Sequence, residues 1–187
     1  MADMLYRLAP EQCAVLVVDI QDRLMQAIPS RDEVTKNAVL LVKAAKVMGV
    51  PVIATTQYAA RIGALLPEVQ AELEGITLLD KLEFDCFDNA GICSVLAALP
   101  EQVNTIVVCG AETHICIYQT MLGGLLAGRR MWVVADGVGS RSPLNHQTGL
   151  ARIREIGGVV ASTEMVIYEW LRQAGTPAFK ALLPFIK

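Results

Sequence analysis

The 187-residue chain has few charged side chains, few aromatic side chains and only two histidines. Charged residues make up 19% of the sequence, and the formal net charge is −3. This acidic balance, with no cluster of lysine and arginine, argues against a nucleic acid as the partner. Hydrophobic residues make up 53% of the chain, which is enough for a substantial core. We therefore expect one folded domain over residues 1–187.

Several signatures of metal and cofactor binding are also missing. Neither an Asp-x-His nor a His-x-x-x-His pair occurs, so a metal site built on histidine is not expected. No Gly-x-Gly-x-x-Gly follows the first apolar run, and no Gly-x-x-x-x-Gly-Lys-[Ser/Thr] is present. The sequence therefore predicts no dinucleotide site and no P-loop, and we expect neither a cofactor nor a metal.

No apolar run reaches the ~18 residues of a membrane span, because charged residues interrupt the candidates, so no membrane partner is expected. Residues 1–12, MADMLYRLAPEQ, lack the charged and apolar regions of a secretory signal. The five cysteines are odd in number and form no Cys-x-x-Cys pair, which favours reduced thiols in a cytoplasmic protein. The apolar excess predicts strands buried on both faces and a homo-oligomer, at least a dimer.

Short β-branched runs alternate with longer helical patterns, which is typical of an α/β fold with a mostly parallel sheet. We expect six strands, near residues 14–20, 50–57, 76–80, 105–110, 131–136 and 158–162. Helices are expected near residues 31–48, 67–73, 89–98, 113–127, 145–156 and 164–173. Residues 57–66 are expected to form a loop, and the apolar tail 174–187 should pack on this domain or on a neighbouring subunit.

Residues with known preferences for helix ends mark several of these boundaries. Gly49 follows the expected helix 31–48, and glycine commonly ends helices. Thr113, Asn145 and Thr163 stand at the starts of three other helices, where their side chains could cap free backbone N–H groups. Asp136, at the end of the fifth strand, is expected to form a turn.

Three residues with catalytic chemistry stand at the ends of separate apolar runs. Asp19 follows AVLVV, Lys81 follows GITLLD, and Cys116 lies in VVCGAETHIC. In a parallel α/β sheet, the carboxyl ends of neighbouring strands meet at one crevice. An acid, an ammonium and a thiol that meet there would supply a nucleophile, its base and a charge stabiliser, as in a hydrolase.

Each of these residues also has a purely structural interpretation. Asp19 could cap the following helix, Lys81 could be a surface lysine, and Cys116 could be an inert buried cysteine. Against the last interpretation, Cys116 lies near the start of the expected helix 113–127, where backbone N–H groups favour a thiolate and can bind an oxyanion. His114, two residues before Cys116, would point to another helix face and is poorly placed as a base.

Taken together, the segments VVDIQDRL, KLEFDCF and GAETHICIYQT resemble the three motifs of the isochorismatase-like cysteine hydrolase family. ADGVGSRS and STEMVIYEWL are similar to the family's last two strand ends, so the resemblance covers roughly residues 12–172. It implies a three-layer α/β/α, Rossmann-like fold with strand order 3-2-1-4-5-6. It also implies that Asp19 is the general base, Lys81 the stabilising cation and Cys116 the nucleophile.

The reaction implied by the resemblance is attack of the thiolate on a carbonyl carbon of a small-molecule substrate, release of an amine or ammonia, and hydrolysis of the thioester. The bond before Glu112 is typically cis in this family, and the backbone N–H groups of Glu112 and Cys116 form the oxyanion hole. Lys81 and the helix start favour the thiolate, whereas the charge of Asp19 opposes it. We expect the positive influences to prevail and the pKa of Cys116 to lie below the usual ~8.5.

Two details narrow the place of the chain within this family. Isochorismatases proper usually lack the cysteine, and nicotinamidases carry a metal-binding Asp-x-His after the second strand. Here that place reads TTQYAAR, without a histidine, and is similar to a metal-free, uncharacterised branch with a TEQY-like motif. We predict a metal-free amidohydrolase that cleaves a small amide or ureido compound. The alternatives are a metal-dependent, nicotinamidase-like amidase and a catalytically silent member that acts as a binding or assembly protein.

The candidate substrate pocket consists of Gln57, Tyr58, Phe84 and Phe87. An amide and three aromatic rings would line a compact, partly apolar cavity, as small-molecule sites require. For the two phenylalanines, packing in the hydrophobic core is the alternative interpretation.

Overall fold

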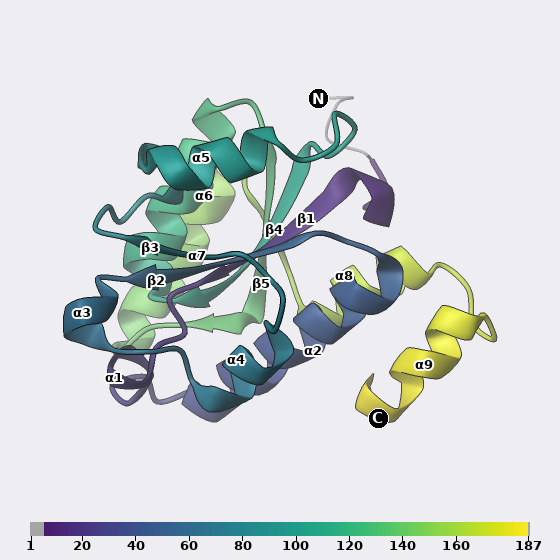
Figure 1. Cartoon of the computed structure of the whole chain (residues 1–187), viewed down its shortest axis with the longest axis horizontal. Helices are drawn as coiled ribbons and strands as arrows, with labels where there is room; N and C mark the ends of the chain where they lie inside the picture. The colour runs from purple at the N-terminus through teal and green to yellow at the C-terminus, as the bar shows by residue number, and fades with distance from the viewer. Residues whose placement is uncertain (1–5, 187) are drawn as a thin grey trace.

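The computed structural model describes residues 6–186 and has a six-stranded sheet at its centre (Figure 1). The strands are β1 (Cys13–Val18), β2 (Val52–Gln57), β3 (Leu78–Lys81), β4 (Thr105–Ala111), β5 (Arg130–Gly139) and β6 (Val159–Ala161). Their order is β3-β2-β1-β4-β5-β6, and all paired neighbours run parallel. The predicted α/β class and the implied strand order are both confirmed.

Helices cover both faces of the sheet and form the two outer layers. One face is covered by α2 (Arg31–Met48), α4 (Pro67–Glu72), α8 (Thr163–Leu171) and α9 (Pro177–Ile186). The other face is covered by α5 (Ala90–Ala97), α6 (Tyr118–Leu126) and α7 (Pro143–Glu155). The shorter elements are α1 (Asp22–Met25), α3 (Ala59–Ile62), a π-helix (Thr113–Ile117) and two 3-10 turns (Pro10–Gln12 and Cys86–Asp88).

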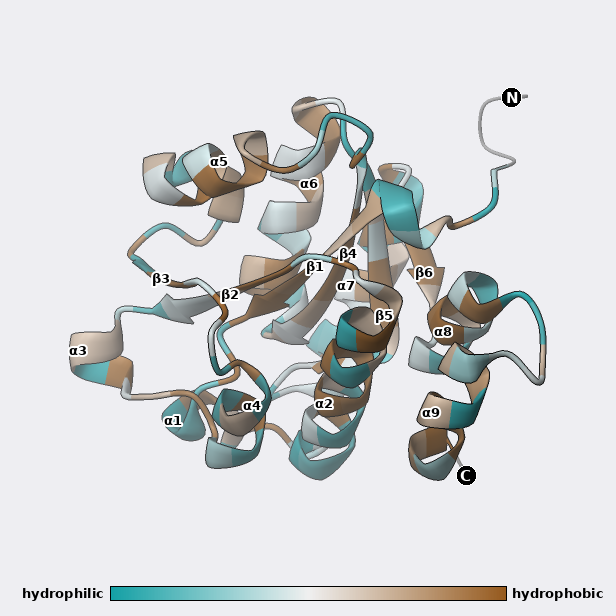
Figure 2. Ribbon diagram, turned by 45° about the vertical axis from the view of Figure 1, so that its right-hand side comes forward, coloured by the Kyte–Doolittle hydropathy of each residue, from teal (hydrophilic) through white to brown (hydrophobic). Residues whose placement is uncertain are grey.

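Most strand positions are apolar because helices cover both faces of the sheet, whereas the edge strand β3 also carries Asp80 and Lys81. Successive side chains along β1 alternate between the two cores. Val15 and Val17 pack with residues of α2 and α8, whereas Leu16 and Val18 pack with residues of α5, α6 and α7. Figure 2 shows the central strands as mostly hydrophobic, in agreement with strands that are covered on both sides.

The predicted elements are present, with some boundaries shifted. The helix over residues 31–48 has its predicted bounds, and Gly49 follows it in the left-handed conformation with φ of 69°. The expected helix 113–127 is instead the π-helix followed by α6. The predicted loop 57–66 is wrong in part, because Gln57 still belongs to β2 and residues 59–62 form α3.

Three predicted caps and one predicted turn are also wrong. Glu112, not Thr113, stands at the N-cap position of the π-helix, and no side chain caps that helix start. Ser142 caps α7 and Ser162 caps α8, so both helices begin before the positions expected from Asn145 and Thr163. Asp136 lies within β5, and its carboxylate accepts hydrogen bonds from the backbone and hydroxyl of Thr163, at 2.8 and 2.9 Å. Asp136 therefore holds the start of α8 against the sheet instead of forming a turn.

The carboxyl-terminal tail forms α9 and packs on this domain, which is one of its two expected placements. Leu182 is buried in the core that α2 also lines, and Lys43 Nζ lies 4.5 Å from the centre of the Phe185 ring. Two parts of the sequence predictions lie outside the described residues. They are residues 1–5, which belong to the segment 1–12 expected to lack a secretory signal, and Lys187, the last residue of the tail. Within residues 6–186, no helix is both long enough and apolar enough to cross a membrane.

Candidate active site

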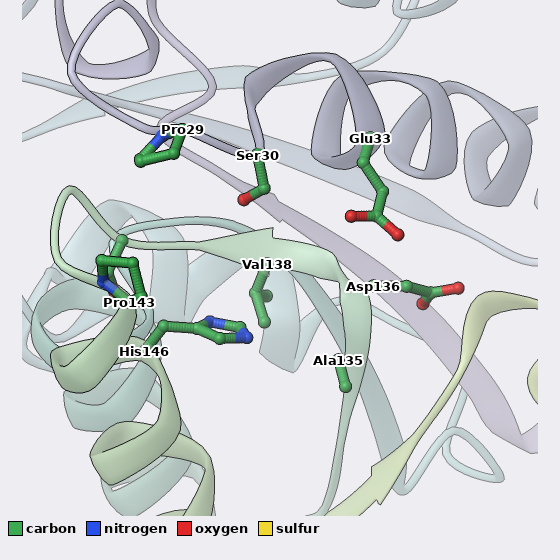
Figure 3. Close-up of a pocket in the computed structure, with 9 residues that line it drawn as sticks. Pro29, Ser30, Glu33, Ala135, Asp136, Val138, Pro143 and His146 are labelled. Carbon is green, nitrogen blue, oxygen red and sulfur yellow. The ribbon is translucent and has the colours of Figure 1, made fainter.

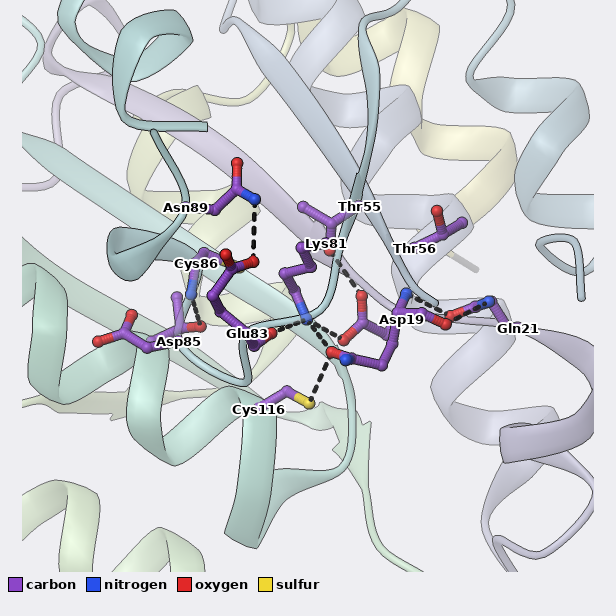
Figure 4. A network of polar contacts seen from close by, with 12 residues as sticks. Asp19, Gln21, Thr55, Thr56, Lys81, Glu83, Asp85, Cys86, Asn89 and Cys116 are labelled. Carbon is purple, nitrogen blue, oxygen red and sulfur yellow. Dashed lines mark hydrogen bonds and ion pairs between the residues drawn. The ribbon is translucent and has the colours of Figure 1, made fainter. Parts of the chain in front are cut away.

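The three residues singled out at strand ends lie at the same edge of the sheet (Figure 4). Asp19 directly follows β1, Lys81 is the last residue of β3, and Cys116 lies in the π-helix that follows β4. Lys81 Nζ donates to Asp19 Oδ2 at 2.7 Å. Parallel strands thus bring side chains that are far apart in the sequence together at one edge of the sheet, as their order requires.

Asp19 and Lys81 form an ion pair that is closed to solvent. Both side chains are 0% exposed, so Lys81 is not the surface lysine that its residue type alone would suggest. The other carboxylate oxygen of Asp19 accepts a hydrogen bond from the hydroxyl of Thr55 at 2.8 Å. Asp19 has a φ of 54°, an uncommon backbone conformation for a residue other than glycine. Residues held in such conformations cluster at functional sites.

All three N–H groups of the Lys81 ammonium have partners. Besides Asp19, they donate to Gln57 Oε1 at 2.6 Å and to the backbone oxygen of Glu83 at 3.2 Å. Burial alone would lower the pKa of Lys81, but the Asp19 carboxylate and the nearby thiols of Cys116 and Cys86 outweigh burial and raise it. Lys81 is therefore a fixed positive charge at neutral pH.

The side chain of Gln57 links the Asp19–Lys81 ion pair to the Cys116 thiol. The sequence predicts Gln57 only as a lining residue of the substrate pocket, whereas the structure places it in direct contact with both groups. Its Oε1, which accepts from Lys81, lies 3.9 Å from Cys116 Sγ and accepts the weak S–H hydrogen bond. Gln21, fully buried, fixes Gln57 in turn: Gln21 Oε1 accepts from the Gln57 backbone N–H at 2.7 Å, and Gln21 Nε2 donates to the Gln57 carbonyl at 3.1 Å.

Gln21 is a site residue that sequence reasoning missed. The sequence alone does not distinguish a glutamine whose side-chain amide is buried from one whose amide is exposed. The available signal was its place two residues after the strand-end acid Asp19, in the same motif.

A close approach of two strands brings the segment that contains Cys116 towards Asp19. Val18 and Gly110 are register partners in β1 and β4, and Gly110 has a φ of 129°. A Cβ at Gly110 would collide with the backbone carbonyl of Val18, so only glycine allows this contact. The chain then passes through Glu112 into the π-helix, where Cys116 is 5% exposed. Single turns of π-helix often occur at functional sites.

The ionisation of Cys116 differs from the expectation. Its pKa is raised to about 12, first by burial and then by the charge of Asp19, while Lys81 lowers it. The prediction of a lowered pKa is wrong because burial of the thiol, together with the charge of Asp19, outweighs the positive charge of Lys81. The Cys116 thiol therefore keeps its proton at neutral pH, beside the Asp19–Lys81 ion pair.

The other four cysteines are free thiols, and three of them are buried. Burial raises the pKa of Cys86 and of Cys109 to about 12 and that of Cys13 to about 11. Cys93 is half-buried, and its thiol donates to the backbone oxygen of Phe87. Cys86 is near Lys81, but its side chain is 0% exposed.

Glu112 stands between β4 and the π-helix. The Ala111–Glu112 peptide is cis, as the family resemblance implies. The Glu112 side chain is turned away towards β5: its carboxylate accepts from the backbone N–H of Arg141 at 2.8 Å and pairs with the Arg141 guanidinium at 3.4 Å. Glu112 and Cys116, the two residues of the predicted oxyanion hole, thus stand at either end of one tight segment.

The other three predicted pocket residues do not share one environment, because two are exposed and one packs against the hydrophobic core. Tyr58, which directly follows Gln57, is 43% exposed, and Phe84, three residues after Lys81, is 53% exposed. Phe87 packs against the core formed with α5, α6 and α7, so for this residue the packing interpretation holds.

A cavity of about 230 Å³ lies apart from this site, beside β5 and between the starts of α2 and α7 (Figure 3). It is lined by Pro29, Ser30, Glu33, Ala135, Asp136, Val138, Ser140, Pro143 and His146. Within residues 6–186, no group of three or more histidine, cysteine, aspartate or glutamate side chains is placed to hold a metal ion.

Comparison with known proteins identifies relatives along almost the whole chain. The model of the isochorismatase domain matches residues 13–165. A secreted isochorismatase effector of Phytophthora sojae (strain P6497) is 32% identical over 184 residues, which cover 97% of this chain and 87% of that protein.

Solved structures show the same fold. A structure described as the MAR1 ribonuclease of Caenorhabditis elegans superposes with a TM-score of 0.90 at 26% identity, covering 97% of this chain and 92% of that one. The YcaC gene product of Escherichia coli, described as an octameric hydrolase of unknown specificity, superposes with a TM-score of 0.89 at 22% identity, covering 97% and 90%.

Proposed function

The chain belongs to the isochorismatase family of hydrolases, and on that premise we propose that it is a cysteine amidohydrolase with Cys116 as its nucleophile. The substrate is a small amide or ureido compound, and the bond cleaved is a C–N bond. The observation that carries the proposal is the buried Asp19–Lys81 ion pair, 2.7 Å long, which Gln57 joins to the Cys116 thiol.

Asp19 moves the proton in each half of the reaction. As the substrate carbonyl enters, Asp19 takes the thiol proton and the sulfur of Cys116 attacks the carbonyl carbon. The tetrahedral intermediate collapses, the C–N bond breaks, and the amine leaves with the proton that Asp19 held. Asp19 then deprotonates a water that attacks the thioester, and the proton returns to the departing sulfur.

Lys81 and the backbone stabilise the negative charge that develops. With Asp19 protonated, the Lys81 ammonium no longer has an anionic partner there and stabilises the nascent thiolate. The backbone N–H groups of Glu112 and Cys116 form the oxyanion hole for the tetrahedral intermediate. A raised thiol pKa is compatible with this scheme, because the thiolate is generated only as Asp19 takes the thiol proton during attack on the substrate.

The proposal distinguishes this enzyme from two alternatives. A nicotinamidase-like amidase would need histidine ligands after β2, where this chain has TTQYAAR. A silent binding or assembly protein would not need to bury an acid, an ammonium and a thiol together, since buried charges cost free energy unless function or pairing retains them. We therefore place the chemistry on Asp19, Lys81 and Cys116, without a metal.

A panel of small amides, hydroxamates and ureides, assayed for release of ammonia or amine, tests the proposal. The supporting result is turnover of at least one compound by the parent and its loss in Asp19→Asn. Turnover that disappears after dialysis against a chelator and returns with zinc, iron or manganese would establish the metal-dependent alternative instead. No turnover of any compound in the panel would refute the amidohydrolase proposal and favour the silent alternative.

The same proposal includes assembly into a homo-oligomer. Several large apolar side chains are exposed on the single chain, among them Leu82 at 64%, Leu126 at 80% and Leu144 at 70%. Leu82 directly follows Lys81, so an interface there would border the candidate active site. The octameric description of the YcaC structure, a protein with the same fold, agrees with such an assembly.

A further inference from the structure

The side chains of the residues just before Cys116 contact one segment, residues 140–146, which comprises the connection after β5 and the first turn of α7. Glu112, Thr113 and His114 are consecutive, and each makes at least one such contact. The contacts are Glu112 with Arg141 (2.8 Å), Thr113 Oγ1 with His146 Nδ1 (2.9 Å), His114 Nδ1 with Ser140 Oγ (3.0 Å) and His114 Nε2 with Asn145 Nδ2 (3.2 Å). The proposed reaction uses none of these side chains.

The partners of His114 fix its ring at both nitrogens. His114 Nε2 lies 3.2 Å from Asn145 Nδ2, and His114 Nδ1 lies 3.0 Å from the hydroxyl oxygen of Ser140, a buried residue. His114 is therefore held in one orientation, two residues before Cys116.

His146 holds the preceding residue in the same way. Thr113 is fully buried, and its hydroxyl has the His146 ring as its partner. Burial lowers the pKa of His146, while Glu33 raises it by a smaller amount, so the ring is neutral at neutral pH. The other side of His146 lines the cavity beside β5 (Figure 3).

The backbone of α7 also touches the π-helix directly. A Cβ at Gly149 would lie 3.1 Å from the Thr113 carbonyl oxygen and 3.2 Å from the His114 Cα. These are closer than ordinary van der Waals contacts, so a methyl group there would push the π-helix by a few tenths of an ångström. The glycine allows α7 to pack against the backbone of the segment that carries the nucleophile.

We propose that Ser140, Asn145, His146 and Gly149 form a clamp that sets the position of the Cys116 thiol relative to Asp19. They are positioning residues, because they touch the π-helix and not the reacting atoms. The proposal rests on the proposed function in that Cys116 is taken as the nucleophile. Displacement of a reacting group by about 1 Å can lower a rate by roughly 100-fold, so a loosened clamp should act on kcat.

The first test compares Asn145→Ala with Gln147→Ala, which removes an exposed amide from the same helix. For Asn145→Ala we expect a kcat about tenfold lower, with KM within about twofold of the parent. Cys116 should also react about threefold faster with iodoacetamide, because a displaced thiol is less desolvated. Cys109 should stay unlabelled, which excludes unfolding as the cause, and Gln147→Ala should match the parent in every measurement.

A second test uses substitutions that separate position from folding. Gly149→Ala should lower kcat without lowering Tm, because alanine favours a helix over glycine while its methyl group displaces the π-helix. His114→Gln keeps a hydrogen-bonding group for Asn145 and should recover activity that His114→Leu loses. If Asn145→Ala and Gly149→Ala both match Gln147→Ala in kcat and in Cys116 alkylation, the clamp is refuted.

Alkylation needs no substrate, so it separates this inference from the proposed function. A parent that hydrolyses nothing in the panel refutes the amidohydrolase proposal. In that case, faster labelling of Cys116 in Asn145→Ala and Gly149→Ala still supports the clamp, and unchanged labelling overturns it.

Discussion

Replacement of Lys81 by methionine should cause a large loss of stability, because it leaves the Asp19 carboxylate buried without its counter-ion. The pair is 2.7 Å long, and both side chains are 0% exposed. Removal of one partner from a buried pair costs about 3–5 kcal/mol. For a domain of this size each kcal/mol shifts Tm by about 2–4 °C, so we expect Lys81→Met to lower Tm by roughly 6–20 °C.

The assay is urea unfolding at neutral pH and at one fixed protein concentration, since assembly would make stability depend on concentration. Lys46→Met is the matched control: Lys46 Nζ lies 3.7 Å from Glu72, but its side chain is 42% exposed. It should cost no more than about 1 kcal/mol. The double variant Asp19→Asn with Lys81→Met should recover most of the loss, because no unpaired charge remains.

A cost below about 1 kcal/mol for Lys81→Met would refute this reasoning. It would mean that Asp19 gains protons or water when its partner is removed, and that the two residues are not a closed ion pair in solution. A double variant as unstable as Lys81→Met alone would show that lost packing, and not the unpaired charge, dominates.

Four further predictions follow from the same residues. Alkylation of Cys116 by iodoacetamide should rise with pH above about 9 instead of reaching a plateau below pH 7, because burial raises its pKa to about 12; a plateau near pH 7 would show a thiolate in the resting site. The free energy of unfolding should fall as pH rises from about 9, by up to about 1.4 kcal/mol per pH unit for each buried thiol. The reason is that the thiols ionise in the unfolded chain at this pH, while Cys86, Cys109 and Cys116 keep their protons in the folded protein. Cys109→Ala should make that slope shallower, and an unchanged slope would contradict the assignment. Dialysis against a chelator should leave turnover within error, whereas a loss reversed by a divalent metal would contradict the metal-free proposal. Light scattering at micromolar concentration should give a mass of at least twice the 20.2 kDa of one chain, and the monomer mass would refute the proposed assembly.

The strand ends could be predicted from the sequence because apolar β-branched runs mark buried parallel strands. Asp19, Lys81 and Cys116 each follow or lie just beyond such a run, and the topology then brings them together. The burial of Lys81 could not be predicted from local pattern, since it depends on Asp19, 62 residues away, and on Gln57. Periodicity predicts that a lysine follows a strand but does not predict what its ammonium reaches.

Other features depend on contacts that no short pattern contains. In a π-helix each backbone hydrogen bond spans five residues, one more than in an α-helix. The sequence THICI carries no periodic signal for that change. The sign of the Cys116 pKa shift also required the structure, because the helix start and Lys81 argued for a lower value while burial decided the outcome. Thr113 and His114 are separated by 26 to 33 sequence positions from the residues of segment 140–146 that they contact, so no local motif reveals these contacts.

The central claim is that the sulfur of Cys116 forms the covalent intermediate, and turnover by Cys116→Ala tests it most directly. The control is Cys109→Ala, which removes another buried thiol, on the far side of β4 from the core that contains Cys116. With an amide found in the panel, we predict that Cys116→Ala keeps its fold and loses kcat by several orders of magnitude, while Cys109→Ala keeps turnover. Retention of more than about a tenth of the parent's activity by a pure Cys116→Ala protein would contradict the account.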